Sequence, residues 1–167
     1  MIAPKIKDYG LSFRSLSERY VTDMIVIHHT GDDVDDDLSA EQIHEIHLGN
    51  GWAGIGYHFV IRKDGTVEAG RPDWAIGSHA YGENSHTIGV HCCGNFEIAE
   101  PTEAQIEALS YVVGWLCDMY DLTPTEETVK GHRDLMPTAC PGEALYDILD
   151  VIRGKAVWYQ QHYKGGD

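Results

Sequence analysis

Short apolar runs and longer amphipathic segments alternate along this chain. Residues 24–27 form a continuous run of apolar, mostly β-branched side chains, which predicts a buried strand ending at two adjacent histidines. Residues 87–93 form a second run of this kind. A turn at Lys63-Asp64-Gly65 predicts a hairpin between its flanking segments. The remaining strands are expected at residues 57–62, 66–69 and 129–132.

Two capping boxes, in which Ser or Thr is followed three residues later by Gln, mark helix starts. The first begins at Ser39 and predicts a helix that runs to about Leu48. The second begins at Thr102 and precedes apolar residues at helical spacing. A last helix is expected to open at Glu143. The apolar positions of these two later helices are Ile106, Leu109, Val113, Leu116 and Tyr120, then Leu145, Ile148, Leu149, Ile152 and Ala156.

Strands interspersed with helices predict an α/β fold, a mixed β-sheet flanked by helices. No repeat, low-complexity tract or linker divides the chain, so residues 1–167 are expected to form a single domain with a substantial core. No apolar run reaches the length of a membrane span, and no signal peptide is visible. We therefore expect synthesis in the cytoplasm and no membrane insertion.

The charge balance narrows the possible partners. Twelve basic and 27 acidic residues give a net charge of −15, which argues against nucleic acid and anionic lipid surfaces. The acidic loop at residues 31–38 lacks the glycine and terminal glutamate of an EF-hand, so we interpret it as solvated. Cys92 and Cys93 are adjacent in an apolar stretch, which indicates buried thiols rather than disulfides.

Two histidines and one cysteine are candidate metal ligands. His28 stands at the end of the first apolar strand, while His132 and Cys140 lie in an irregular segment between two predicted elements. Zinc binds imidazole nitrogen and thiolate, and catalytic zinc sites use three protein ligands plus water. The spacing alone is not specific, because the chain has no CxxC or HExxH motif. A buried histidine and cysteine without a metal remain the alternative.

Other histidines have simpler interpretations. His29 follows His28 on the strand and should point to the opposite face, so both cannot bind one metal. His58 is expected to fill the core or a sheet face. His44 and His47 lie three apart on a predicted helix, where a packing or solvated role is expected.

Five segments, in order, carry a resemblance. They are IVIHHT at 25–30, GIGYHFVI at 54–61, DGTVEAGR at 64–71, HAYGENSHTIGV at 79–90, and GHRD at 131–134 with ACPG at 139–142. Together they resemble the type 2 N-acetylmuramoyl-L-alanine amidase family, which includes phage T7-like lysozymes and animal peptidoglycan recognition proteins. The resemblance covers residues 20–155, nearly the whole chain.

The resemblance implies zinc bound by His28, His132 and Cys140. It also implies that Tyr57 is a catalytic tyrosine. Thr138 stands where the T7-like enzymes carry lysine, and recognition proteins with amidase activity commonly carry threonine there. Zinc would then generate hydroxide and polarise the amide carbonyl, and Tyr57 or Thr138 would help to hold the oxyanion.

His79 and Asn84 match residues that contact the muramyl peptide in the recognition proteins. For Asn84, capping of its own loop is the alternative. Trp52 and Trp74 flank this region and are expected either in a sugar-binding groove or buried.

The expected reaction is hydrolysis of the amide bond between N-acetylmuramic acid and L-alanine in peptidoglycan or muropeptides. The alternatives are a peptidoglycan-binding module without catalysis, whose members typically lack the cysteine, and a zinc peptidase that cuts the stem peptide. We expect a monomer that acts on the wall after release, as phage endolysins do, or on muropeptides.

Overall fold

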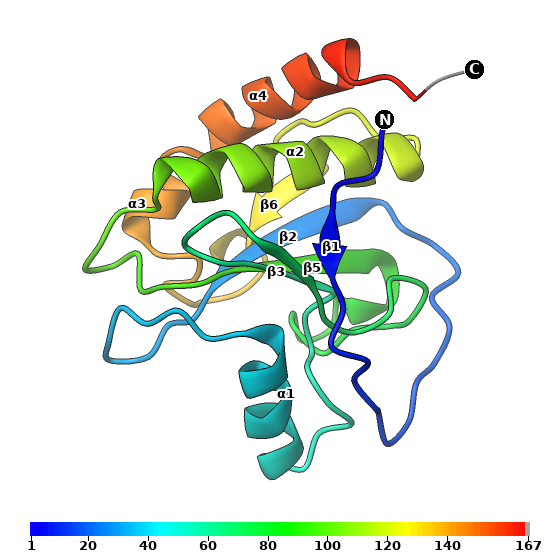
Figure 1. The fold of residues 1–167 in the computed structure, drawn as a ribbon, viewed down its shortest axis with the longest axis vertical. Coiled ribbons are helices and arrows are strands. Elements are labelled where there is room, and N and C mark those ends of the chain that lie inside the picture. The colour runs from blue at the N-terminus through cyan, green and yellow to red at the C-terminus, as the bar shows by residue number, and fades with distance from the viewer. Residues whose placement is uncertain (166–167) are drawn as a thin grey trace.

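The computed structural model, which describes residues 1–165, contains one mixed six-stranded sheet with helices on both of its faces (Figure 1). The strands are β1 (Ile6–Lys7), β2 (Met24–His29), β3 (Phe59–Ile61), β4 (Val67–Ala69), β5 (Thr87–Cys92) and β6 (Val129–Gly131). The α-helices are α1 (Ala40–Gly49), α2 (Glu103–Met119), α3 (Glu143–Tyr146) and α4 (Leu149–His162), with short 3-10 helices η1 (Asn84–His86) and η2 (His132–Asp134).

The strand order across the sheet is β1-β4-β3-β5-β2-β6. β5 and β6 both pair with β2 in parallel, whereas β3 and β4 form an antiparallel hairpin. This arrangement confirms the predicted mixed sheet. In the register between β2 and β5, His28 lies opposite His91.

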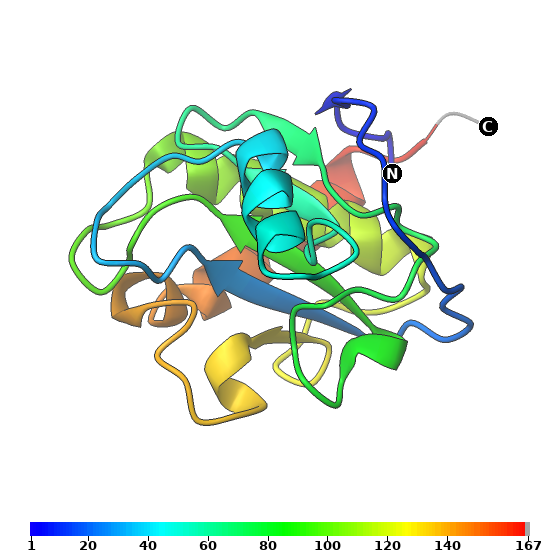
Figure 2. The same ribbon diagram turned by 90° about the horizontal axis from the view of Figure 1, so that it is seen from below.

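The two faces of the sheet are covered differently. Helices α2 and α4 lie over one face, and α1 lies over the other (Figure 1 and Figure 2). Ile25 and Ile27 of β2 join the large apolar core on the α2 side. Because side chains alternate along a strand, His28 points to the α1 side. The fold therefore places the histidine on the less densely apolar face.

Both capping boxes form as predicted, with Ser39 at the start of α1 and Thr102 at the start of α2. The predicted burial of the Cys92 and Cys93 thiols is confirmed, and all four cysteines are free, with Cys140 half-buried. No helix within residues 1–165 is long and apolar enough to cross a membrane.

Three elements differ from the prediction. The strand expected at residues 57–62 is limited to β3, although the carbonyls of Tyr57 and His58 still accept backbone hydrogen bonds from Arg71 and Gly70. The last helix is divided into α3 and α4 around Asp147 and Ile148. Strand β1 was not predicted, since two residues paired in parallel with β4 leave no local pattern.

Candidate functional site

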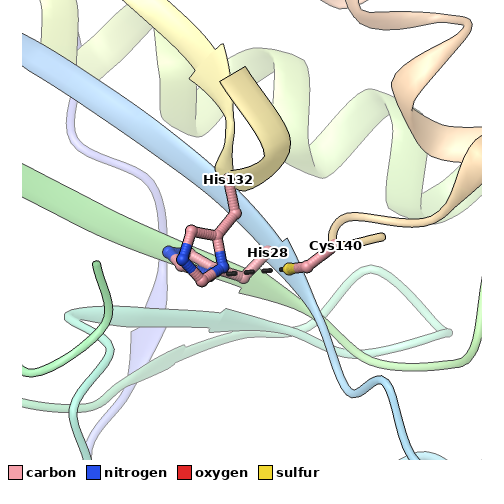
Figure 3. A group of neighbouring side chains, drawn as sticks. All are labelled: His28, His132 and Cys140. Atoms are coloured by element: carbon pink, nitrogen blue, oxygen red, sulfur yellow. Dashed lines mark hydrogen bonds between the residues drawn. The ribbon is translucent and has the colours of Figure 1, made fainter. Parts of the chain in front are cut away.

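Three side chains from separate parts of the chain meet beside the carboxyl end of β2. His28 is the penultimate residue of β2, His132 directly follows β6, and Cys140 lies in the loop before α3. One ligand atom from each lies within 4.8 Å of the other two, and Figure 3 shows the three side chains converging. Nδ1 of His28 lies 3.6 Å from Sγ of Cys140. The predicted ligand set is therefore assembled in space.

Burial favours the uncharged form of all three groups. Burial, with smaller contributions from His79 and His132, holds the pKa of His28 well below its ordinary value. Burial also lowers the pKa of His132. Burial raises the pKa of the Cys140 thiol to about 12, although the backbone N–H of His29 opposes the shift. A bound cation would reverse the shift at the thiol, because it favours the thiolate.

The cysteine is held by backbone contacts from both sides. The backbone N–H of His29 donates to Sγ of Cys140 at 3.4 Å, and the backbone N–H of Arg133 donates to the Cys140 carbonyl at 2.8 Å. The Cys140 N–H donates to Oγ1 of Thr138 at 3.2 Å. The His29 ring points away from the cluster and accepts a hydrogen bond from the Phe96 N–H at 3.1 Å. The prediction that His29 faces away from His28 is confirmed.

A second histidine lies directly behind His28. Nε2 of His28 is 2.9 Å from Nδ1 of His79, and Nε2 of His79 is 3.1 Å from Oγ1 of Thr87. The Thr87 hydroxyl donates to the Glu83 carbonyl at 2.8 Å. His79 therefore contacts His28, a proposed metal ligand. It also lies where we predicted contact with the substrate.

Tyr57 lies beside the cluster, with its ring centroid 5.0 Å from that of His28. Nδ1 of His47, on α1, accepts a hydrogen bond from the Gly56 N–H at 3.0 Å. The backbone N–H of Arg71 donates to the Tyr57 carbonyl at 2.8 Å. Burial raises the pKa of the Tyr57 hydroxyl, so it stays protonated and able to donate.

The remaining helix and strand histidines have structural partners. Nδ1 of His44 accepts from the Ile55 N–H at 3.0 Å, so His44 and His47 both fix the segment before Tyr57. His58 is buried, and its Nδ1 accepts from the Gly89 N–H at 3.0 Å. The packing roles predicted for these histidines are confirmed for His44 and His58.

A groove of about 530 Å³ opens in front of the cluster. Asn84 lines it, and its Oδ1 accepts hydrogen bonds from the backbone N–H groups of His79 and Ala80, both at 2.9 Å. Trp52 lines the groove with 43% of its surface exposed. The groove-lining residues are Trp52, Ala53, Tyr57, Ser78, His79, Ala80, Tyr81, Asn84, His132 and Met136.

Among the groove-lining residues with large side chains, Tyr81 and Met136 were not singled out from the sequence. Tyr81 is 92% exposed, and its place between His79 and Asn84 was the only available signal. Met136 places Sδ 2.9 Å from Nε2 of His132, a contact that depends on the path of the loop. The alternative of buried tryptophans is wrong, because Trp74 is 50% exposed and Trp52 also reaches solvent.

Known proteins are similar to this chain in sequence and in fold. Residues 18–143 match the N-acetylmuramoyl-L-alanine amidase family. The endolysin of Klebsiella phage KP32 is 37% identical over 130 residues, which cover 75% of this chain and 83% of the relative. An N-acetylmuramoyl-L-alanine amidase from Clostridium intestinale has a similar structure, with a TM-score of 0.82 and 38% identity over 92% of this chain and 97% of that one.

The fold also occurs in proteins of peptidoglycan recognition. A complex of the peptidoglycan recognition proteins LCa and LCx with bound tracheal cytotoxin gives a TM-score of 0.73. Its identity is 30%, and the match covers 84% of this chain and 88% of that one. The family match spans most of the chain, and the phage relative exceeds 30% identity over three quarters of it. The chain therefore belongs to the N-acetylmuramoyl-L-alanine amidase family.

Proposed function

We propose that this protein is a zinc-dependent hydrolase of the amide bond between N-acetylmuramic acid and L-alanine. The observation that carries the proposal is the convergence of His28, His132 and Cys140 next to the groove. Family membership supports the amide bond as the target, and the convergent ligands support the metal.

The distance between His28 and Cys140 fits zinc. Zinc–sulfur bonds of about 2.3 Å and zinc–nitrogen bonds of about 2.0–2.1 Å, arranged tetrahedrally, separate N and S by roughly 3.6 Å. That separation agrees with the 3.6 Å between Nδ1 of His28 and Sγ of Cys140. Three protein ligands leave the fourth position for water or substrate, as in catalytic sites. When bound at such a site, zinc lowers the pKa of water to about 7 and polarises a carbonyl.

The chain's own residues supply donors to the reacting amide. We assign the protonated Tyr57 hydroxyl to the carbonyl oxygen, where negative charge develops as the carbonyl carbon is attacked. The Thr138 oxygen accepts from the Cys140 N–H, which leaves its hydroxyl hydrogen free for the same purpose. The Tyr57 hydroxyl is also our candidate for delivering a proton to the leaving alanine nitrogen.

The groove suits a ligand that is part sugar and part peptide. The exposed rings of Trp52 and Tyr81 offer apolar faces for a pyranose. We propose that His79 and Asn84, which also line the groove, contact the muramyl peptide. The similarity to recognition proteins with bound tracheal cytotoxin supports peptidoglycan or its fragments as the ligand.

We further propose that the protein acts on the cell wall after release from the cytoplasm, or on soluble muropeptides. The phage endolysins among its relatives support the first setting. All the proposed site residues come from one copy of the chain, which is compatible with activity as a monomer.

The test is digestion of intact peptidoglycan, with the soluble products identified by mass spectrometry. We expect stem peptides with a free N-terminal L-alanine and uncut glycan chains, and no release with a chelator present. Cys140→Ser should abolish release, whereas Cys117→Ser, a buried thiol remote from the cluster, should retain it. Cleavage inside the stem peptide would indicate the peptidase, and wall binding without release would indicate the recognition module.

A further inference from the structure

A chain of buried polar groups runs behind His28 and ends at a backbone carbonyl. We propose that this chain, through Thr87 and His79, fixes the tautomer of His28 so that its Nδ1 lone pair faces the metal position. His79 and Thr87 are then positioning residues for a ligand. The functional meaning of the inference rests on the zinc site proposed above, but the tautomer itself does not.

The direction of each hydrogen bond follows from the fixed end of the chain. The Glu83 carbonyl can only accept, so the single hydroxyl hydrogen of Thr87 points to it across 2.8 Å. The Thr87 oxygen, 3.1 Å from Nε2 of His79, must then accept, which places the His79 proton on Nε2.

The position of the His79 proton determines in turn which nitrogen of His28 carries a proton. A neutral His79 with its proton on Nε2 has a bare Nδ1, which must accept from Nε2–H of His28 across 2.9 Å. Nδ1 of His28 is therefore the nitrogen without a proton. That nitrogen faces Sγ of Cys140 at 3.6 Å, where a shared cation would lie.

Burial, the space at Gly89 and a hydrogen bond to Asn84 hold His79 in contact with His28. His28, His79 and Thr87 are 1%, 8% and 0% exposed, so water competes little for these hydrogen bonds. A Cβ added to Gly89 of β5 would lie 2.6 Å from the His79 ring, so glycine there makes room for the ring. The backbone of His79 is fixed in turn by Oδ1 of Asn84.

The hydrogen-bond partner of His28 is an imidazole, which is not among the usual partners of metal-binding histidines. Metal-binding histidines generally donate their second N–H to a carboxylate, a backbone carbonyl or water. Here the neutral imidazole of His79 takes that place. Its own protonation pattern is set by the Glu83 carbonyl, which lies two hydrogen bonds further along the chain of polar groups. The arrangement orients His28 without adding negative charge, which leaves more positive charge for the substrate carbonyl.

The first test is ¹⁵N NMR of the ring nitrogens of His28 in the metal-free protein near neutral pH. We expect a protonated Nε2 and a bare Nδ1 in the wild type. A His28 that carries its proton on Nδ1 would overturn the inference, and this measurement depends on neither zinc nor a variant.

The second test compares Thr87→Val, which keeps the shape of the side chain but removes the hydroxyl, with Thr87→Ser, which keeps it. Zinc affinity is measured by competition with a chromophoric chelator. We expect Thr87→Val to weaken zinc binding by about 10–100-fold, the range for partners of metal ligands, and Thr87→Ser to bind as the wild type does. Equal affinity in the wild type and Thr87→Val would refute the positioning role. If even the wild type bound no zinc, the proposed function would fail, and NMR would still decide the tautomer.

Discussion

The two faces of the sheet differ in chemistry although the same strands build both. Toward α2 and α4, β2 contributes Ile25 and Ile27 to a large apolar core. Toward α1, it contributes His28, which lies among other buried histidines. Buried polar groups destabilise a fold unless they are paired, and His28 and His58 are paired with another histidine or with the backbone, whereas Nδ1 of His91 has no hydrogen-bond partner within residues 1–165. One face supplies stability, which allows the other to hold reactive groups.

The largest expected effect comes from removing a ligand on the α1 side. Cys140→Ser should lower amidase activity by more than about 10³-fold, above the loss for a single oxyanion donor, because zinc prefers thiolate. The fold should persist, since Cys140 lies in a loop and is only half-buried. Product analysis, zinc content and circular dichroism check this. A Cys140→Ser variant with wild-type activity would exclude the cysteine from the site.

Next in size is loss of the tyrosine hydroxyl. Tyr57→Phe should reduce turnover by about 10²–10³-fold, the usual loss for one oxyanion donor. Zinc affinity should not change, because the ring packing against His28 is retained. Steady-state kinetics on muropeptides, alongside zinc titration, separate the two effects. A normal turnover number would remove Tyr57 from the proposed mechanism.

A smaller effect is expected one residue away from the ligand. Ile27→Val on the α2 side should cost about 0.5–1.5 kcal/mol of unfolding free energy, as deletion of one buried methylene usually does. Zinc affinity and activity of the folded protein should stay at wild-type levels. Urea denaturation and zinc titration test this. Loss of zinc affinity without loss of stability would show that the two faces are not independent.

The smallest expected effect is the contribution of His47 to the pH dependence of the free energy of unfolding. Burial lowers the pKa of His47 to about 4 from an ordinary value of 6.5. Between these values the unfolded chain binds more protons, so this histidine should reduce stability as pH falls from 6.5 to 4 and have no effect above 6.5. His47→Asn keeps an acceptor for the Gly56 N–H but does not titrate.

Urea denaturation at several pH values, with a chelator present throughout so that loss of metal does not contribute, measures this effect. The slope of stability against pH should be shallower in His47→Asn than in the wild type. Parallel curves would mean that His47 is equally protonated in the folded and unfolded states.

Local signals predicted most of the fold. The capping boxes at Ser39 and Thr102 depend on residues three apart, and β2 and β5 depend on continuous apolar runs, so the sequence contains the whole signal. The register of Tyr57 could not be predicted in this way. The hydrogen bonds from Gly56 to His47 of α1 and from Arg71 to Tyr57 form only when distant segments meet.

The same division applies to the site. His28, His132 and Cys140 could be chosen by chemistry and resemblance, and the structure brings them together. The contact between His79 and His28 could not be predicted, because it depends on how a long loop returns over Gly89. The sequence was therefore sufficient to predict the candidate ligands but not the contact that His79 makes with one of them.

Zinc, held by three residues beside the carboxyl end of β2, is proposed to be needed for the release of stem peptides. The most direct measurement removes metal from the purified protein, adds zinc back in steps, and follows bound zinc and released L-alanine N-termini in the same samples. We predict that no stem peptide is released without metal. Release should rise in proportion to bound zinc up to one ion per chain. Full release from the zinc-free protein would contradict this prediction.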